Sequence, residues 1–592
     1  MLLMYIFFLI IHSLFSLMVY LPTIDPNELS VVAVSAFFTG SDWSSVMSQS
    51  SYYYGFVQAA LYTPIMLVTR DPFLQYKLMV LVGGALLSLI PLFAYSISYK
   101  LGAKKPWQAG LCALICGGYV THFAHSNFVW NETIAIFLPW FIAWLFFRMY
   151  YKNGGRTVKM TSSLVLGAVL ALSLGAHYRL AAVVLSVIAA LLFAKFVLKK
   201  KIVRLVPFFS SFVIFFVLQT LAAMGIQSAL WKTLEPELLN NTPENFFANL
   251  PSALSDGGVV RFFQAVLAQL YYFCVSSWGL GALGMFLFFS VAKDFFVSRR
   301  KKIPCAYSSG FLIFSCFSFF TVLFTLFTGA FYKFSSDAFY TQQDTMLFGR
   351  YLDGVTPLAI LFALVFIFLH DLRLKHIFGG ASALLLSAAA YYVFALPVTL
   401  SAQTTRISPI LALYPLLIGE NNSTVLSLTS ILAASSSALS VLALFVVIVS
   451  CTKKLKPVVI SVFFLMTTVY SAFFAAFYYI PLCNSESESK NAAYTEISAH
   501  LFNQEEAPDI TVYRTTRNAA MMLQYLNQNT TVIYAKNSRE IEENSFVVVP
   551  AGEILRFHTY DKKIIFVELA RTAEYSVYAY GEKALAYAQS QK

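Results

Sequence analysis

Residues 1–28 read MLLMYIFFLIIHSLFSLMVYLPTIDPNE, an apolar stretch followed at once by a polar turn with two carboxylates. The first twenty residues are long enough to cross a membrane as a helix, and they show neither a basic leader nor a small-residue cleavage site. We therefore expect a retained first span. The carboxylates of Asp25 and Glu28 then lie at the membrane surface, where an acid is costly unless it is solvated or used.

The apolar pattern recurs through most of the chain. Of 592 residues, 58% are hydrophobic and 12% are charged, against about 25% charged in an ordinary soluble domain. This composition excludes a soluble globular protein and predicts an α-helical polytopic membrane protein. Apolar runs predict about thirteen transmembrane helices, near residues 2–20, 78–99, 107–124, 130–147, 161–177, 180–198, 205–224, 263–291, 307–330, 352–369, 377–397, 425–450 and 458–481.

The last part of the chain has a different composition. Residues 484–592 hold 14 of the 29 acidic and 11 of the 41 basic residues, with almost no long apolar run. We therefore expect two domains, a membrane domain at 1–483 and a small α/β domain at 484–592. The α/β class is predicted by helical patterns near 491–503 and 518–526 and strand patterns at 510–513, 531–535, 546–550 and 564–569.

The positive charge predicts the orientation in the membrane. Of the 30 basic residues before position 484, 22 fall in alternate loops between the predicted spans, at 100–105, 148–159, 195–204, 293–302, 373–375 and 453–456. The positive-inside rule places these loops and the N-terminus in the cytoplasm. An odd number of spans then makes the C-terminal domain extracytoplasmic. The net charge of +12 is thus explained by topology in a plasma membrane, and nucleic acid is not a predicted partner.

The longest outer loop, residues 21–77, follows the first span. It is half apolar and aromatic, and it contains Gly40 and the Tyr54-Gly55 pair. Such a loop is expected to lie on the membrane surface among the lipids. We therefore expect chemistry, if any, on the outer side. A plain alternative is that Asp25 or Glu28 only caps the helix that follows.

Four features together resemble the GT-C superfamily of polytopic glycosyltransferases, which includes protein O-mannosyltransferases and lipid A aminoarabinose transferases. They are the acidic motif after the first span, the Gly40 and Gly55 elements of the first outer loop, the Asn131-Glu132 pair, and Gly349-Arg350-Tyr351 before a span with Pro357. The resemblance implies an inverting transfer of a sugar from a polyprenyl-phosphate donor. The acceptor would be a glycan, lipid or protein of the cell envelope.

The acidic motif departs from the family pattern. The family usually has two adjacent acids, whereas Asn27 precedes Glu28 here and Asp25 lies three positions before it. By its distance to Gly40, Glu28 holds the place of the second family acid. A positioned carboxylate would take the proton of the acceptor hydroxyl as general base. Asp25 and Glu28 both stay open as that catalytic base.

The leaving group of such a reaction is a lipid phosphate, so the site needs positive charge. Arg350 fits this role through bidentate contacts with phosphate oxygens, and further donor-phosphate candidates are Arg179, Lys333 and Tyr351. The alternative for Arg350 and Tyr351 is an interfacial anchor pair.

Glu132 is predicted as a supporting acid or a residue next to a metal, and a helix cap is its alternative. His122 and His125 flank the same turn. A divalent metal is therefore left open, and no other cofactor is implied.

Two other classes of function compete with this interpretation. A transporter or flippase of lipid-linked saccharides could also carry carboxylates and aromatic residues at its outer entrance. Against it, ionisable residues within the predicted spans are sparse, and a polar path across the membrane usually needs some. A membrane scaffold that displays the C-terminal domain would not explain the acidic first loop.

Overall fold

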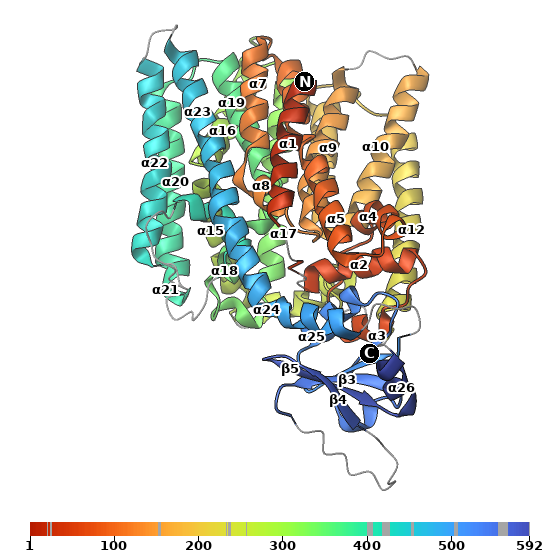
Figure 1. Cartoon of the computed structure of the whole chain (residues 1–592). Helices are drawn as coiled ribbons and strands as arrows, with labels where there is room; N and C mark the ends of the chain where they lie inside the picture. The colour runs from red at the N-terminus through yellow and green to blue at the C-terminus, as the bar shows by residue number, and fades with distance from the viewer. Residues whose placement is uncertain are drawn as a thin grey trace.

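The computed structural model describes residues 1–19, 22–23, 26–151, 156–232, 234, 238–255, 257–399, 406–416, 427–450, 455–501, 507–553 and 566–590. Long apolar helices lie roughly side by side, and a small sheet domain sits at one end of this bundle (Figure 1). We call this end of the bundle the C-domain end.

Eleven helices among the described residues are long and apolar enough to cross a membrane, or twelve if a bent pair at 343–369 counts as one span. The predicted helical membrane fold is thereby confirmed, whereas the count of thirteen stays a prediction. The long helices are α5 (Pro72–Leu87) with α6 (Ile90–Leu101), α9 (Glu132–Tyr151), α10 (Arg156–Ala176), α11 (Ala181–Leu192), α12 (Leu205–Leu230), α15 (Gly258–Ser276), α16 (Leu280–Lys301), α17 (Ser309–Lys333), α20 (Leu374–Ala390), α22 (Leu428–Ser450) and α23 (Leu455–Phe474). The bent pair comprises α18 (Gln343–Leu347) with η5 (Gly349–Tyr351), and α19 (Thr356–Leu369).

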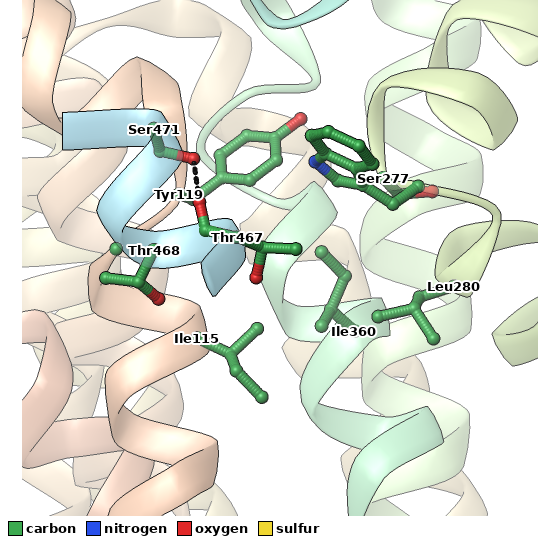
Figure 2. A pocket seen from close by; sticks show the side chains of 10 residues that line it. Ile115, Tyr119, Ser277, Leu280, Ile360, Thr467, Thr468 and Ser471 are labelled. Carbon is green, nitrogen blue, oxygen red and sulfur yellow. Dashed lines mark hydrogen bonds between the residues drawn. The ribbon is translucent and has the colours of Figure 1, made fainter. Parts of the chain in front are cut away.

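Two predicted spans are broken in the structure. The span expected at 263–291 forms α15 and α16, because Trp278 and Gly279 between them have positive φ angles of 56° and 78°. The span expected at 107–124 forms α7 (Pro106–Gly117) and α8 (Val120–His125). Tyr119 and Ser277, from the two breaks, meet at a cavity of about 20 Å³, which is room for about one water molecule (Figure 2).

The loop expected to lie on the membrane folds into short helices at the C-domain end. They are α2 (Pro26–Phe38), α3 (Ser44–Met47) and α4 (Val57–Val68), which follow α1 (Leu2–Met18). Gly55 has a φ of +94°, and a Cβ there would lie 2.4 Å from the carbonyl oxygen of Ala176. Only glycine therefore lets this loop pack directly on the end of α10.

The C-terminal domain has the α/β character that its alternating pattern predicts. The five strands β1 (Ile510–Tyr513), β2 (Val532–Ala535), β3 (Ser545–Pro550), β4 (Phe566–Arg571) and β5 (Tyr575–Tyr580) form a sheet in the order β2-β1-β3-β5-β4. Strands β1, β2 and β3 are parallel, whereas β4 and β5 pair in antiparallel fashion. Helices α25 (Arg517–Leu526) and α26 (Glu582–Ser590) complete the domain. Strand β5 and helix α26 are not in the sequence-based prediction.

The C-terminal domain is attached to the bundle by side-chain contacts as well as by the chain. Helix α24 (Ile480–Leu501) crosses the predicted domain boundary at 483 without a break, so the two-domain division stays a prediction. Ser45 donates a hydrogen bond to the carbonyl oxygen of Val532 at 2.7 Å. Tyr525 donates one to the carbonyl oxygen of Pro72 at 2.5 Å. The sheet domain thus packs on the first loop of the bundle.

The orientation in the membrane gives a direct prediction. The N-terminus lies at the end of the bundle opposite the C-terminal domain (Figure 1), and the basic loops predict a cytoplasmic N-terminus. In a background with the native cysteines replaced, we expect Ser538→Cys to react with an impermeant maleimide in intact cells. The control Arg300→Cys, in the basic last turn of α16, should react only after the membrane is permeabilised. The reverse pattern would overturn the orientation.

Candidate active site

A buried carboxylate at the start of α9 holds two arginines. Glu132 lies in the first helical turn, where the helix dipole favours a negative charge, and 3% of it is exposed. Arg179 Nη1 donates to Glu132 Oε1 at 2.9 Å, and its second nitrogen donates to Oε2, which makes the pair bidentate. Arg350 Nε donates to the same Oε1 at 2.5 Å. The sequence-predicted residues Glu132, Arg179 and Arg350 therefore converge, although they are far apart in the chain.

Aromatic rings complete the surroundings of these cations. The guanidinium carbon of Arg350 lies 4.1 Å from the centre of the Trp130 ring, and that of Arg179 lies 4.9 Å from the Tyr351 ring. Lys333 Nζ lies 3.7 Å from the Phe348 ring and 5.9 Å from the Tyr351 ring. Each contact has cation–π geometry. We call Arg179, Lys333 and Arg350, with Glu132 between the arginines, the cation cluster.

One carboxylate balances only part of the charge of the cation cluster. Lys333 has no hydrogen bond to a carboxylate among the contacts that the structure gives for the described part of the chain. Nearby, Arg406 donates to the buried Asp344 at 2.9 and 2.7 Å. With two arginines and one carboxylate, the cation cluster keeps a net positive charge and can attract an anion such as a phosphate.

His177 positions the short turn that carries Arg179. This turn, η1 (Tyr178–Leu180), begins after α10, and the backbone N–H of Arg179 donates to His177 Nδ1 at 3.2 Å. Burial, and next the adjacent Arg179 guanidinium, hold the pKa of His177 well below its usual range. A neutral imidazole can accept this hydrogen bond, whereas a protonated one cannot.

Glu28 is wholly buried and its carboxylate is oriented by three donors. Its Oε1 accepts from the Tyr76 hydroxyl at 2.8 Å and from the backbone N–H of Val129 at 2.7 Å. Thr23 donates to Oε2. Because Val129 precedes Trp130, the Glu28 carboxylate is held against the segment that stacks on Arg350. Asp25 lies outside the described residues.

An inter-domain cavity of about 470 Å³ opens beside Glu28. Glu28 and Trp130 line it from the membrane domain, Tyr494 lines it from α24, and Asn518 and Glu574 line it from the C-terminal domain. This volume lies in the range of small-molecule sites. Trp130 belongs to the cavity wall and also contacts Arg350, so it joins the cavity to the cation cluster.

Several residues of this region carry no signal in the sequence. Trp130 lies in an apolar run, and Tyr76 lies in a predicted loop next to a span. Asp344 and Arg406 are 62 positions apart, so no local pattern links them. Asp353 does carry a signal, because a lone acid next to an apolar span is costly and needs a partner. Its partners are Tyr272 and His125.

The pattern of His122, His125 and Glu132 allows a divalent metal. His125 Nε2 lies 3.5 Å from Asp353 Oδ2, and Glu132 is engaged by two arginines. In the described ranges, no group of three or more His, Cys, Asp or Glu side chains is arranged to hold a metal ion. The contacts that the structure gives the Glu132 carboxylate are those with Arg179 and Arg350.

Comparisons with known proteins give structural neighbours only. No family model matches the sequence, and a search of curated proteins finds no match. The chain is similar to ArnT from Cupriavidus metallidurans bound to undecaprenyl phosphate, with 12% identity, a TM-score of 0.47, and coverage of 98% of this chain and 97% of that chain. Its apo state gives 10% identity, a TM-score of 0.46 and the same coverage. An Archaeoglobus fulgidus oligosaccharyltransferase tethered with an acceptor peptide gives 11% identity, a TM-score of 0.35, and coverage of 92% and 69%.

Proposed function

We propose that this protein is an inverting GT-C type glycosyltransferase that acts on the extracytoplasmic face of the plasma membrane. It moves a sugar from a polyprenyl-phosphate donor to a cell-envelope glycan, lipid or protein. The observation that carries the proposal is the place of Trp130, which contacts Arg350 of the cation cluster and lines the inter-domain cavity together with Glu28. A candidate group for holding a phosphate therefore contacts the same tryptophan that lines the cavity with a candidate group for accepting a proton.

The donor phosphate binds at the cation cluster. Arg350 and Arg179 can engage phosphate oxygens while Glu132 holds their guanidinium groups in place. The Lys333 amino group lies in the same cluster, and the Tyr351 ring contacts both Arg179 and Lys333. The negative charge that grows on the phosphate as the glycosidic bond breaks is stabilised by these cations, which need no rearrangement.

The acceptor hydroxyl attacks the anomeric carbon from the side of the cavity. A new bond forms between the acceptor oxygen and the anomeric carbon, while the bond from that carbon to the phosphate oxygen breaks. The proton of the acceptor hydroxyl passes to a carboxylate, for which Glu28 is the described candidate and Asp25 the other predicted one. The sugar inverts because attack and departure occur on opposite faces. The polyprenyl phosphate leaves as an anion and needs no proton.

The first test is binding of a lipid phosphate. We expect the purified protein in lipid nanodiscs to bind undecaprenyl phosphate at least about tenfold more tightly than undecaprenol, because two charged hydrogen bonds contribute well over 1.4 kcal/mol. Equal binding of the two lipids would contradict the proposal.

The second test separates the enzyme from the transporter. The protein is reconstituted into vesicles with a membrane lipid extract that contains polyprenyl-phosphate-linked sugars, and mass spectrometry follows these lipids. A glycosyltransferase consumes the sugar-linked lipid, releases polyprenyl phosphate and glycosylates an acceptor. Movement of the intact lipid between leaflets without loss of sugar would instead identify a flippase.

A further inference from the structure

The bent segment that presents Arg350 contains a fully buried acid. Asp353 lies between η5 and α19, at the 59° bend between the helical segments Gln343–Tyr351 and Thr356–Leu369. None of its side chain is exposed. An acid in such a place costs free energy unless hydrogen bonds and charges compensate for the lost water. The proposed reaction gives Asp353 no chemical step, so its contacts must explain it.

One oxygen of the Asp353 side chain accepts a hydrogen bond from α15, and the other faces a histidine of α8. The Tyr272 hydroxyl of α15 donates to Oδ1 at 2.7 Å, and this hydroxyl also accepts from the backbone N–H of Ala412 at 3.2 Å. On the other oxygen, His125 Nε2 of α8 lies 3.5 Å from Oδ2. Tyr272, His125 and Asp353 are all fully buried. The bend is therefore bonded to α15 through Asp353, and the same side chain packs against His125 of α8.

The same partners also contact the rest of the bend. A Cβ at Gly349 would lie 2.0 Å from the Tyr272 ring, so the backbone before Arg350 packs directly on this ring. The His125 ring lies 5.3 Å from the Trp130 ring, and Trp130 is the ring on which Arg350 stacks. A chain of contacts therefore leads from Asp353 through His125 and Trp130 to Arg350. Arg350 lies three residues before Asp353 in the sequence.

We propose that Asp353 is a positioning residue, which fixes the turn at 349–355 so that the Arg350 guanidinium is held against Trp130 and Glu132 in the geometry that a lipid phosphate needs. This inference rests on the proposed role of Arg350. Asp353 does not touch the substrate. It acts through the backbone of its own turn, in which the N–H groups of Leu352 and Asp353 donate to the carbonyl oxygen of Gly349 at 2.7 and 3.2 Å.

The test uses two conservative variants with matched controls. Asp353→Asn keeps an oxygen for Tyr272 but replaces the carboxyl group that faces His125, and Tyr272→Phe keeps the ring under Gly349 but removes the hydroxyl. The controls are Asp294→Asn and Tyr307→Phe, which alter a similar Asp–Tyr hydrogen bond of 2.9 Å outside the site. In nanodiscs, the two test variants should bind undecaprenyl phosphate roughly tenfold more weakly, as expected when an orienting partner is lost. Undecaprenol binding and the controls should not change.

A double variant checks that the effect passes through Arg350. In an Arg350→Lys background the planar guanidinium is already lost, so Asp353→Asn should weaken binding of undecaprenyl phosphate by much less than in the native background. Full additivity of the two changes would overturn the proposal, because a merely structural role of Asp353 predicts independent effects.

Hydrogen exchange supplies a readout without any ligand. The amides of 349–355 should exchange faster in Asp353→Asn and Tyr272→Phe than in the native protein and the controls. If folded Tyr272→Phe shows native exchange and native binding, the proposal is wrong, and this variant decides alone if Asp353→Asn does not fold. If the native protein does not prefer undecaprenyl phosphate to undecaprenol, the proposed function fails, and exchange still decides whether Asp353 holds the turn.

Discussion

Glu28→Gln is expected to lower the rate of sugar transfer at least about 100-fold while donor binding stays unchanged. General-base catalysis contributes roughly 10²- to 10⁴-fold, and 100-fold corresponds to about 2.7 kcal/mol of transition-state stabilisation. The shape of the site survives the change. The Gln oxygen still accepts from Tyr76 and from the Val129 N–H, and the Thr23 hydroxyl can turn to accept from the new amide.

The measurement is the transfer rate with purified protein and saturating donor, together with the affinity for undecaprenyl phosphate. Asp42→Asn is the control, because Asp42 lies in the same outer loop, is 68% exposed and pairs with Lys232. Asp25→Asn is measured in parallel, and loss of turnover in only one of the two variants identifies the base. If the Glu28→Gln and Asp25→Asn proteins both transfer sugar at the native rate, the two acids are only helix caps or solvated loop residues. The catalytic interpretation then fails.

The helices could be predicted because a long apolar run in a membrane can satisfy its backbone hydrogen bonds in few structures other than a helix. Where a run breaks could not be predicted in the same way. Trp278 and Gly279 are both compatible with an apolar helix, and the break between α15 and α16 follows from their backbone angles and from the close packing of Gly279 against Leu442. Such a contact links segments far apart in the chain, and no local pattern encodes it.

The strand that the sequence-based prediction omits shows a similar limit. Residues 575–580 read YSVYAY, and strand β5 lies between β3 and β4 in the sheet. Ser576, Val577 and Ala579 are buried, whereas the exposure of the tyrosines is intermediate. The buried positions thus hold small or polar residues, and the partly exposed positions hold tyrosines. This pattern differs from the usual alternation of buried apolar and exposed polar residues in a strand. The position of the strand is set by its two neighbours.

The candidate site shows how far single residues can be interpreted. Charged and amphipathic residues at a membrane surface are costly unless they have a role, and this cost singles out five residues in the sequence. The structure brings these five together: Glu132, Arg179, Lys333, Arg350 and Tyr351. The sequence could not show that Glu132 serves both arginines, since its partners lie 47 and 218 positions away. It also could not show the role of Trp130, because an aromatic residue in an apolar run has the same signature whether it packs or stacks on a cation.

Arg350→Lys is expected to weaken use of the donor by about 1.5 to 3 kcal/mol, or roughly 10- to 150-fold, because hydrogen bonds to charged groups contribute this much. An interfacial anchor needs only a charge on a long stem, which lysine supplies. Arg350 does more than this, since one planar group stacks on Trp130, donates through Nε to Glu132 and leaves its other nitrogens for a phosphate. A lysine ammonium cannot keep all three contacts.

The donor dependence of the transfer rate and the binding of undecaprenyl phosphate are measured for Arg350→Lys and Arg350→Ala. Arg406→Lys is the control, because Arg406 also pairs with a buried carboxylate, that of Asp344, but is 57% exposed. A raised donor KM in Arg350→Lys, with native values in Arg406→Lys, supports phosphate binding by a fixed guanidinium. Native kinetics in Arg350→Lys would make Arg350 an anchor. The phosphate would then have to bind at Arg179, the other guanidinium that Glu132 holds in the cation cluster.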